Sequence, residues 1–221
     1  MDSALHNAGM TLMLDRAGIT GADGASHNGM WDLAMCTSMP HVSMAAPRDG
    51  TRLKELFAQA LDINDHPTIL RYPKGSLPED ITALRSIPAG DILYEKISSK
   101  NTKKIAIIPV GPMAHSAIEA AHNIDCSLSV LDMRWVLPIS SNVIEWLKSF
   151  DACLTIEDGV RDGGVGNLLM QKLHENDIHI PMMNLGIQKD FLPTATRENL
   201  LQQNHMLPAD IIENAYRLIN S

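Results

Sequence analysis

The sequence predicts an α/β fold built mainly from parallel strands. Over 221 residues, short apolar runs alternate with amphipathic segments, a pattern typical of repeated strand–helix units. The predicted strands are the apolar runs at 11–14, 42–46, 68–72, 105–110, 127–133, 152–157 and 181–186. The predicted helices lie between them at 51–61, 116–123, 140–150, 165–176 and 208–219. Several of them begin beside Ser or Thr, residues that cap helix N-termini.

Composition narrows the class of protein. The apolar residues make up 45% and the charged residues 20% of the chain, which excludes disordered and collagen-like chains. A formal charge of -8 argues against a surface that binds nucleic acid or an anionic membrane. No apolar run approaches the roughly 18 residues of a membrane span, and no signal peptide is recognisable. Three cysteines without CxxC spacing indicate reduced thiols in a cytoplasmic protein. We therefore expect small-molecule partners, with no nucleic acid and no membrane.

A polar stretch divides the chain. Between 75 and 104 the strand–helix pattern gives way to prolines, glycines and a basic cluster, so we place a linker at 81–104 between regions 1–80 and 105–221. The first region has only three predicted strands, and a parallel sheet needs cover on both faces. A missing N-terminal portion is the favoured interpretation, and a minimal domain with a short N-terminal helix is the alternative.

Two cations follow predicted strand ends in the first region. Arg16 comes two residues after the run at 11–14, and Lys74 two residues after the run at 68–72. In open α/β sheets ligands bind beyond the carboxyl ends of the strands, and two cations beside glycines can hold a phosphate group. We expect an anionic ligand at this edge. The alternative is that Arg16 pairs with Asp15 or Asp23 and that Lys74 is a solvated turn residue.

Asp23 and His27 lie in the glycine-rich segment that follows Arg16. His27 could donate a proton or a hydrogen bond to a substrate hydroxyl, and Asp23 could orient a hydroxyl or the imidazole. The alternatives are a solvated loop histidine and an Asx turn. Spacing alone leaves both interpretations open.

Two further patterns favour structural roles. The Gly-Gly-Val-Gly segment at 163–166 precedes a predicted helix but lacks the G-x-G-x-x-G spacing, so close helix packing is favoured over anion binding. The nine histidines are scattered along the sequence, and no two of them lie four residues apart. No metal site is therefore expected in this chain.

Several motifs, in order along the chain, resemble the signature of 1-deoxy-D-xylulose-5-phosphate synthases, which are thiamine-diphosphate enzymes similar to transketolase. These motifs are DRAG at 15–18, GADGASHNGMWD at 21–32, APRD at 46–49, RYPKG at 71–75, DMRWVLP at 132–138, EDG at 157–159 and GGVG at 163–166. The resemblance implies that 1–80 is the later part of a pyrimidine-binding domain with a parallel sheet. It implies that 105–221 is a C-terminal transketolase-like α/β domain.

The resemblance also implies an activity. Family enzymes condense pyruvate with glyceraldehyde 3-phosphate, release carbon dioxide and form 1-deoxy-D-xylulose 5-phosphate for isoprenoid, thiamine and pyridoxal synthesis. The complete enzyme uses thiamine diphosphate and Mg²⁺, and we expect a homodimer.

Site residues follow from the same resemblance. Arg16 and Lys74 would bind the phosphate of the acceptor aldehyde, and the catalytic candidates Asp23 and His27 would contact its hydroxyl or carbonyl. Many relatives have arginine in place of Lys74, and lysine keeps the charge but loses the bidentate fork. Ala195 stands where relatives usually have glycine, which affects the local turn.

Other family features lie upstream of the resembled segment, among them the glutamate that protonates the pyrimidine and the magnesium–diphosphate site. Residues 1–6 resemble the interior of a family helix. We expect a missing N-terminal half or a complementary chain to supply these features, and no tight cofactor binding by this chain alone. One alternative is a β-type subunit of a two-chain transketolase or 2-oxo-acid dehydrogenase. Another is a non-catalytic dimerisation module.

Overall fold

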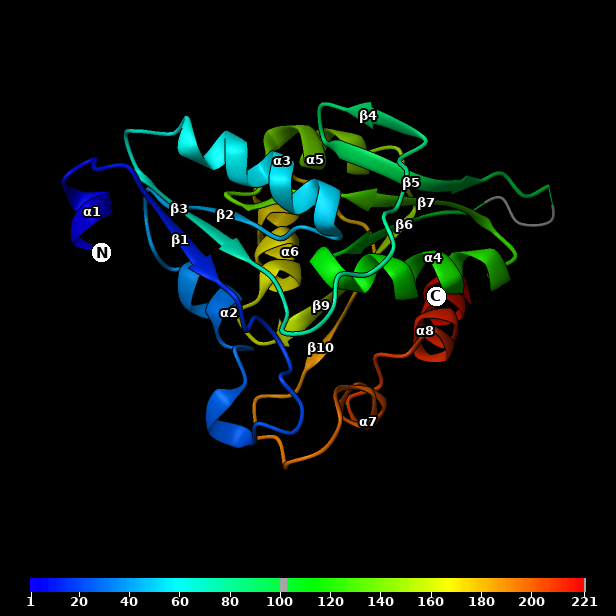
Figure 1. Cartoon of the computed structure of the whole chain (residues 1–221). Coiled ribbons are helices and arrows are strands. Elements are labelled where there is room, and N and C mark those ends of the chain that lie inside the picture. The colour runs from blue at the N-terminus through cyan, green and yellow to red at the C-terminus, as the bar shows by residue number, and fades with distance from the viewer. Residues whose placement is uncertain (100–102, 221) are drawn as a thin grey trace.

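The computed structural model describes residues 1–99 and 103–220 as two β-sheets with helices packed on them (Figure 1). The first sheet has the order β1-β3-β2-β8. Its three parallel strands are β1 (Met10–Leu14), β3 (Pro67–Arg71) and β2 (Ser43–Ala45). Strand β8 (Trp135–Leu137) comes from the second half of the chain and pairs antiparallel with β2. The first sheet therefore contains residues from both halves.

Short helices and one long helix accompany the first sheet: α1 (Asp2–Leu5), the 3-10 helix η1 (Ala25–His27), α2 (Asp32–Cys36) and α3 (Gly50–Leu61). Helix α3 begins where the Asp49 side chain accepts a hydrogen bond from the Arg52 amide at 2.8 Å, a typical N-cap. Its buried Leu56 packs with Leu70 of β3. This packing covers one face of the first sheet.

The second sheet has the order β10-β9-β6-β7-β5-β4. Four of its strands run parallel, from the edge strand β10 (Met182–Ile187) through β9 (Ala152–Val160) and β6 (Lys104–Pro109) to β7 (Ser127–Asp132). Strand β5 (Gly90–Lys96) runs antiparallel to β7, and β4 (Arg85–Ile87) runs antiparallel to β5. The α/β class with parallel strands that the sequence predicts is confirmed.

Helices cover both faces of the second sheet. One layer holds α4 (Ala114–Asn123) and α8 (Pro208–Asn220), which lie side by side in Figure 1, and the other holds α5 (Ser141–Leu147) and α6 (Val165–Glu175). Side chains of β6 alternate between the two cores, with Ile107 in one and Ile108 in the other, as the two-residue period of a strand requires. The 3-10 helix η2 (Gly111–Met113) and helix α7 (Arg197–Gln203) complete the described elements.

The structure corrects two details of the sequence-based expectation. The predicted linker is not irregular, because 85–87 and 90–96 form the β4–β5 hairpin that extends the second sheet; residues 100–102 of that linker lie outside the described residues. Strand β9 also continues three residues beyond its predicted end, so Asp158 lies within the strand and, like Glu157, is buried. The boundary between the two regions remains a prediction.

Two other sequence-based points concern the described residues. The three cysteines, Cys36, Cys126 and Cys153, are buried free thiols. None of the helices in 1–99 and 103–220 is long and apolar enough to cross a membrane.

Candidate functional site

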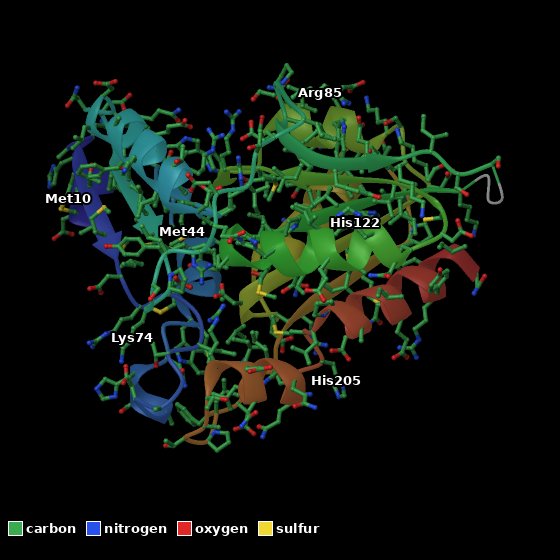
Figure 2. All side chains as sticks on the ribbon, turned by 45° about the vertical axis from the view of Figure 1, so that its right-hand side comes forward. Met10, Met44, Lys74, Arg85, His122 and His205 are labelled. Atoms are coloured by element: carbon green, nitrogen blue, oxygen red, sulfur yellow. The ribbon has the colours of Figure 1, made fainter. Side chains whose placement is uncertain are left out.

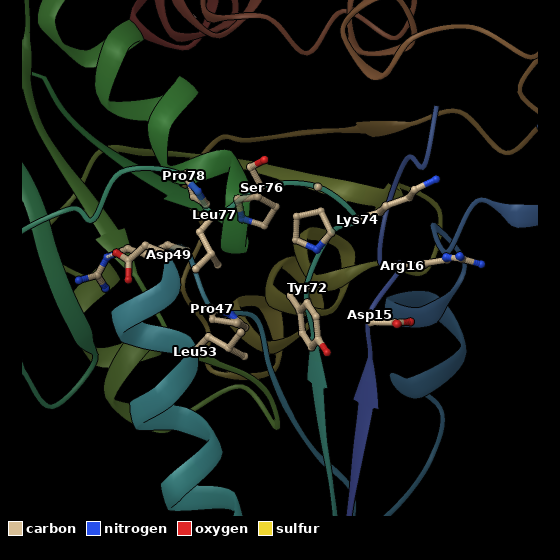
Figure 3. Close-up of a pocket in the computed structure, with 14 residues that line it drawn as sticks. Asp15, Arg16, Pro47, Asp49, Leu53, Tyr72, Lys74, Ser76, Leu77 and Pro78 are labelled. Carbon is tan, nitrogen blue, oxygen red and sulfur yellow. Dashed lines mark ion pairs between the residues drawn. The ribbon is translucent and has the colours of Figure 1, made fainter. Parts of the chain in front are cut away.

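The two predicted cations lie at one edge of the first sheet. Strands β1 and β3 are parallel neighbours, with Leu14 opposite Arg71 at their carboxyl ends. Arg16 and Lys74 follow these ends and line one pocket of about 310 Å³. Figure 3 shows both side chains on the same side of this pocket, with Leu77 on the other side. Parallel pairing alone therefore brings together two charges 58 positions apart in the sequence.

Asp23 is the ion-pair partner of Lys74. The ammonium group of Lys74 donates to both carboxylate oxygens of Asp23 at 2.7 Å, and 46% of the Lys74 side chain is exposed. The hydrogen bond from Lys74 holds the pKa of Asp23 below its usual value, with further contributions from the charges of Arg16 and His27. Lys74 is therefore not merely a solvated turn residue, and the ion pairs of the described residues include none between Arg16 and Asp15 or Asp23.

His27 ends the 3-10 helix η1 in the same loop. Its Nδ1 atom lies 3.1 Å from the hydroxyl oxygen of Ser26, and the ring is exposed. His27 lies in the same loop as Asp23, which pairs with Lys74, and the charge of Arg16 contributes to the lowered pKa of Asp23. The structure therefore places Arg16, Asp23, His27 and Lys74 at one location. The roles assigned to them remain predictions.

Directly behind this edge lies a buried ion network that the sequence analysis missed. Arg71, the last residue of β3, is completely buried and donates to Asp32 at 2.8 Å and to Asp158 at 2.9 Å. The other oxygen of Asp158 accepts a hydrogen bond from Arg197 at 2.8 Å. A charged residue inside the apolar run at 68–72 was the available signal, because a buried arginine needs carboxylate partners.

Glu157 lies beside Asp158 in β9 but binds the N-terminus of helix α6. Its carboxylate accepts hydrogen bonds from the backbone amides of Val165 and Gly166, both at 2.9 Å, at the start of α6. Burial raises the pKa of Glu157 to about 7, against the lowering effect of these two hydrogen bonds. A side chain at Gly164 would place its Cβ 2.4 Å from a Glu157 oxygen. The Gly-Gly-Val-Gly segment therefore packs closely against Glu157, and the hydrogen-bond acceptor at this helix N-terminus is the protein's own carboxyl group.

A second buried arginine, also missed from sequence, joins the two halves. Arg48 donates to Asp91 at 2.9 Å and to Asp132 at 2.5 Å, and its Nε lies 3.1 Å from Asp49. Asp91 belongs to β5 and Asp132 to β7. Arg48 therefore fixes the end of β2 to the second sheet.

Metal-ligating side chains do not cluster in the described residues. Within 1–99 and 103–220 there is no group of three or more His, Cys, Asp or Glu side chains arranged to hold a metal ion. Mg²⁺ with a bound diphosphate is held through carboxylate and other oxygen ligands. Such a site needs only one or two protein carboxylates besides phosphate oxygens and waters, so its place outside this chain stays a prediction.

Two family models match this arrangement. Residues 1–80 match the transketolase pyrimidine-binding domain, and residues 94–211 match the transketolase C-terminal domain. The chain belongs to the transketolase family.

Within that family the chain is similar to 1-deoxy-D-xylulose-5-phosphate synthases. It is 42% identical over 215 residues to the synthase of Clavibacter sepedonicus and 40% identical over 218 residues to that of Nocardia farcinica. Each alignment covers 96% of this chain but only 32% and 34% of the respective relative. The chain thus spans about a third of the length of these relatives.

A solved structure has a similar fold. It is described as a split gene transketolase, inactive beta4 tetramer, and it matches with a TM-score of 0.77 at 23% sequence identity. The match covers 95% of this chain and 67% of that one. It supports the arrangement of both sheets within one transketolase-like fold.

Proposed function

We propose that this chain is the C-terminal portion of a 1-deoxy-D-xylulose-5-phosphate synthase and that it holds the phosphate of the acceptor, glyceraldehyde 3-phosphate. The observation that carries the proposal is the position of Arg16 and Lys74 on the same side of one pocket at the carboxyl edge of the first sheet. Relatives that are 40–42% identical over nearly the whole chain bear the name of this synthase. They favour it over a dehydrogenase subunit or a non-catalytic module.

The ion pair of Lys74 with Asp23 suggests how an acceptor would bind. A phosphate group carries more negative charge than a carboxylate, so it competes with Asp23 for the ammonium group while Arg16 supplies a second cation. Asp23 is then free to accept a hydrogen bond from the acceptor hydroxyl. His27, exposed in the same loop, is placed to donate to the carbonyl oxygen.

The rest of the site belongs to another segment or chain in this proposal. Strand β1 is an edge strand, and its Met10, Leu12 and Met13 side chains are 42%, 39% and 40% exposed. Figure 2 places Met10 at the outer margin of the first sheet. An apolar edge strand favours pairing with a further strand. An N-terminal part of the synthase, or a complementary chain, would cover this edge and bring thiamine diphosphate and Mg²⁺ into a cytoplasmic homodimer.

A chimera tests the proposed activity. Residues 1–221 replace the matching third of the Clavibacter sepedonicus synthase, and product formation is followed with each substrate varied separately. Charge-assisted contacts to phosphate are worth about 1.5 to 3 kcal/mol. Arg16→Ala should therefore raise the KM for glyceraldehyde 3-phosphate about ten- to a hundredfold and leave the KM for pyruvate nearly unchanged.

Lys74→Ala should repeat this effect, Lys74→Arg should keep activity, and the Arg16/Lys74 double variant should be less than additive if both cations hold one group. Arg217→Ala, an exposed arginine on α8, is the matched control. An equal rise in the KM for pyruvate would show that the acceptor assignment is wrong. An inactive wild-type chimera would contradict the proposed function itself.

The cofactor part of the proposal has its own test. The isolated chain should show no micromolar binding of thiamine diphosphate in calorimetry, with or without Mg²⁺, because the proposal assigns the magnesium–diphosphate site to another segment or chain. The intact Clavibacter sepedonicus synthase serves as the positive control. Magnesium-dependent micromolar binding to the isolated chain would contradict this expectation.

A further inference from the structure

The loop between β1 and α2 carries three glycines at three-residue intervals. Gly18, Gly21 and Gly24 have φ angles of 71°, 75° and 87°, a region that other residues rarely adopt. Asp23 and His27 belong to the same loop. The course of this loop therefore fixes where both candidate catalytic groups lie.

Each of these glycines faces the second half of the chain. A Cβ added at each would lie close to a residue there: 2.2 Å from the Oδ2 of Asp158 at Gly18, 3.1 Å from the backbone nitrogen of Arg197 at Gly21, and 3.3 Å from the hydroxyl oxygen of Thr194 at Gly24. Every third residue of this part of the loop therefore lies against the second half of the chain. The loop therefore rests on the end of β9 and on the segment that enters α7.

Arg197 links this surface to the loop. Its Nη1 donates to the backbone oxygen of Ile19 at 3.0 Å, and its Nη2 donates to Asp158 at 2.8 Å. Through its other oxygen, Asp158 pairs with Arg71, which in turn pairs with Asp32 at the start of α2. Both ends of the loop, Ile19 and Asp32, are thus joined to the same buried carboxylate.

A ring contact supports the same arrangement. Trp31, at the end of the loop, meets Phe191 edge-to-face with ring centroids 5.9 Å apart. Phe191 belongs to the segment between β10 and α7. Two separate contacts, one from the first residue of α7 and one from the segment before it, therefore hold the loop.

We propose that Arg197 is a positioning residue of the acceptor site. It holds the loop so that Asp23 meets Lys74 and His27 faces the acceptor, although Arg197 itself is not placed among the groups that bind it. This inference rests on the proposed function for the identity of the acceptor. A planar guanidinium can donate in two directions at once, toward a carbonyl and a carboxylate, whereas a lysine ammonium is a compact point charge on a flexible stem.

The first arm of the test uses the chain itself and needs no activity. Hydrogen–deuterium exchange is measured residue by residue in wild type, Arg197→Met, Arg197→Lys and the control Arg217→Met. We expect amide exchange in 18–29 to rise about tenfold or more in Arg197→Met, by less in Arg197→Lys, and not at all in the control. Exchange in β6 and β7 should stay unchanged in all variants, because Asp158 keeps its pairing with Arg71.

Two results would overturn the proposal in this arm. One is loop exchange that stays at the wild-type level in both Arg197 variants. The other is a rise spread evenly over the chain, since this would show a general loss of stability. If Arg197→Met does not fold, Arg197→Lys, which keeps a cation beside Asp158, decides between these outcomes alone.

The second arm measures catalysis in the chimera. Misplacing a catalytic group by about 1 Å can cost up to roughly a hundredfold in rate, so Arg197→Met should lower kcat and raise the KM for glyceraldehyde 3-phosphate by about ten- to a hundredfold together. The KM for pyruvate should stay within about twofold, and Arg197→Lys should recover part of the loss. Wild-type kinetics in Arg197→Met would overturn the positioning role while leaving the proposed function intact. An inactive wild-type chimera would contradict the proposed function, and the exchange experiment would still decide the role of Arg197.

Discussion

The carboxyl edge of the first sheet carries two kinds of cation. Arg71 is completely buried between Asp32 and Asp158. Arg16 and Lys74, which follow the ends of β1 and β3, are exposed, and Lys74 forms an ion pair with Asp23. The difference separates two uses of positive charge: Arg71 is neutralised inside the protein and joins its halves, whereas Arg16 and Lys74 remain accessible to an anionic ligand.

The pKa values of the buried groups explain why Arg71 cannot take the role of the exposed cations. Burial alone would lower the pKa of Arg71, but the neighbouring charges of Asp32 and Asp158 raise it above its ordinary value. Burial alone would likewise raise the pKa of Asp158, whereas Arg71 and then Arg197 hold it below its usual range. Each buried charge depends on its partner, so none of them is available to a ligand.

The largest effect expected from this comparison is on stability. Arg71→Met leaves Asp32 without its cation and Asp158 with Arg197 alone, and removing one partner of a buried pair costs about 3 to 5 kcal/mol. Urea denaturation of the isolated chain should show this loss, while Arg16→Ala should leave the urea midpoint unchanged. A loss below about 1 kcal/mol in Arg71→Met would remove the distinction between the two kinds of cation.

A smaller effect separates the two neighbouring acids of β9. Asp158 meets two guanidinium groups, whereas Glu157 meets two backbone amides, and burial raises the pKa of Glu157 to about 7. The folded chain therefore binds this proton more tightly than the unfolded chain, in which the pKa is near 4.5. Stability from this group is present below about pH 4.5 and is lost as the pH rises toward 7.

The free energy of unfolding, measured in urea at several pH values, tests that sign. Between pH 5 and 7 wild type should lose more stability than Glu157→Gln, with a difference in slope of at most about 1.4 kcal/mol per pH unit, the limit for one proton. The Gln variant keeps one oxygen to accept a hydrogen bond from α6. Parallel curves for the two proteins would show that Glu157 does not titrate in this range.

The two kinds of cation also differ in how far the sequence reveals them. Arg16 and Lys74 could be placed together because each follows an apolar run, and the ends of parallel strands meet at one edge. The partners of Arg71 could not be found in this way, because Asp158 lies 87 positions away and was expected beyond the end of its strand. The resemblance to a family named the exposed site. Its motifs also contain Asp32, Arg71 and Asp158, but they did not show that these residues pair with one another.

Arg48 shows the same limit in the fold. Its partners Asp91 and Asp132 lie on β5 and β7, and β5 belongs to a stretch that reads as a linker because it is rich in polar residues and turns. Strand β8 is only three residues long and pairs with β2 of the other half. Local patterns predict the elements that form their own core, whereas these elements are determined by contacts with distant residues.

The smallest predicted effect concerns the exposed pair itself. Asp23→Asn removes the carboxylate that Lys74 contacts, so the ammonium group becomes more available to an anion. Inorganic phosphate, titrated into the isolated chain and followed by ³¹P NMR, should bind about two- to fivefold more tightly, the range that an exposed ion pair is worth. The tightening should disappear when Lys74→Met is added, and the urea midpoint should not move.

In the chimera the same Asp23→Asn change should lower kcat, because Asp23 is proposed to contact the acceptor hydroxyl. Tighter phosphate binding together with slower turnover would separate the two roles of Asp23, whereas weaker phosphate binding would show that Lys74 is not held back by this carboxylate.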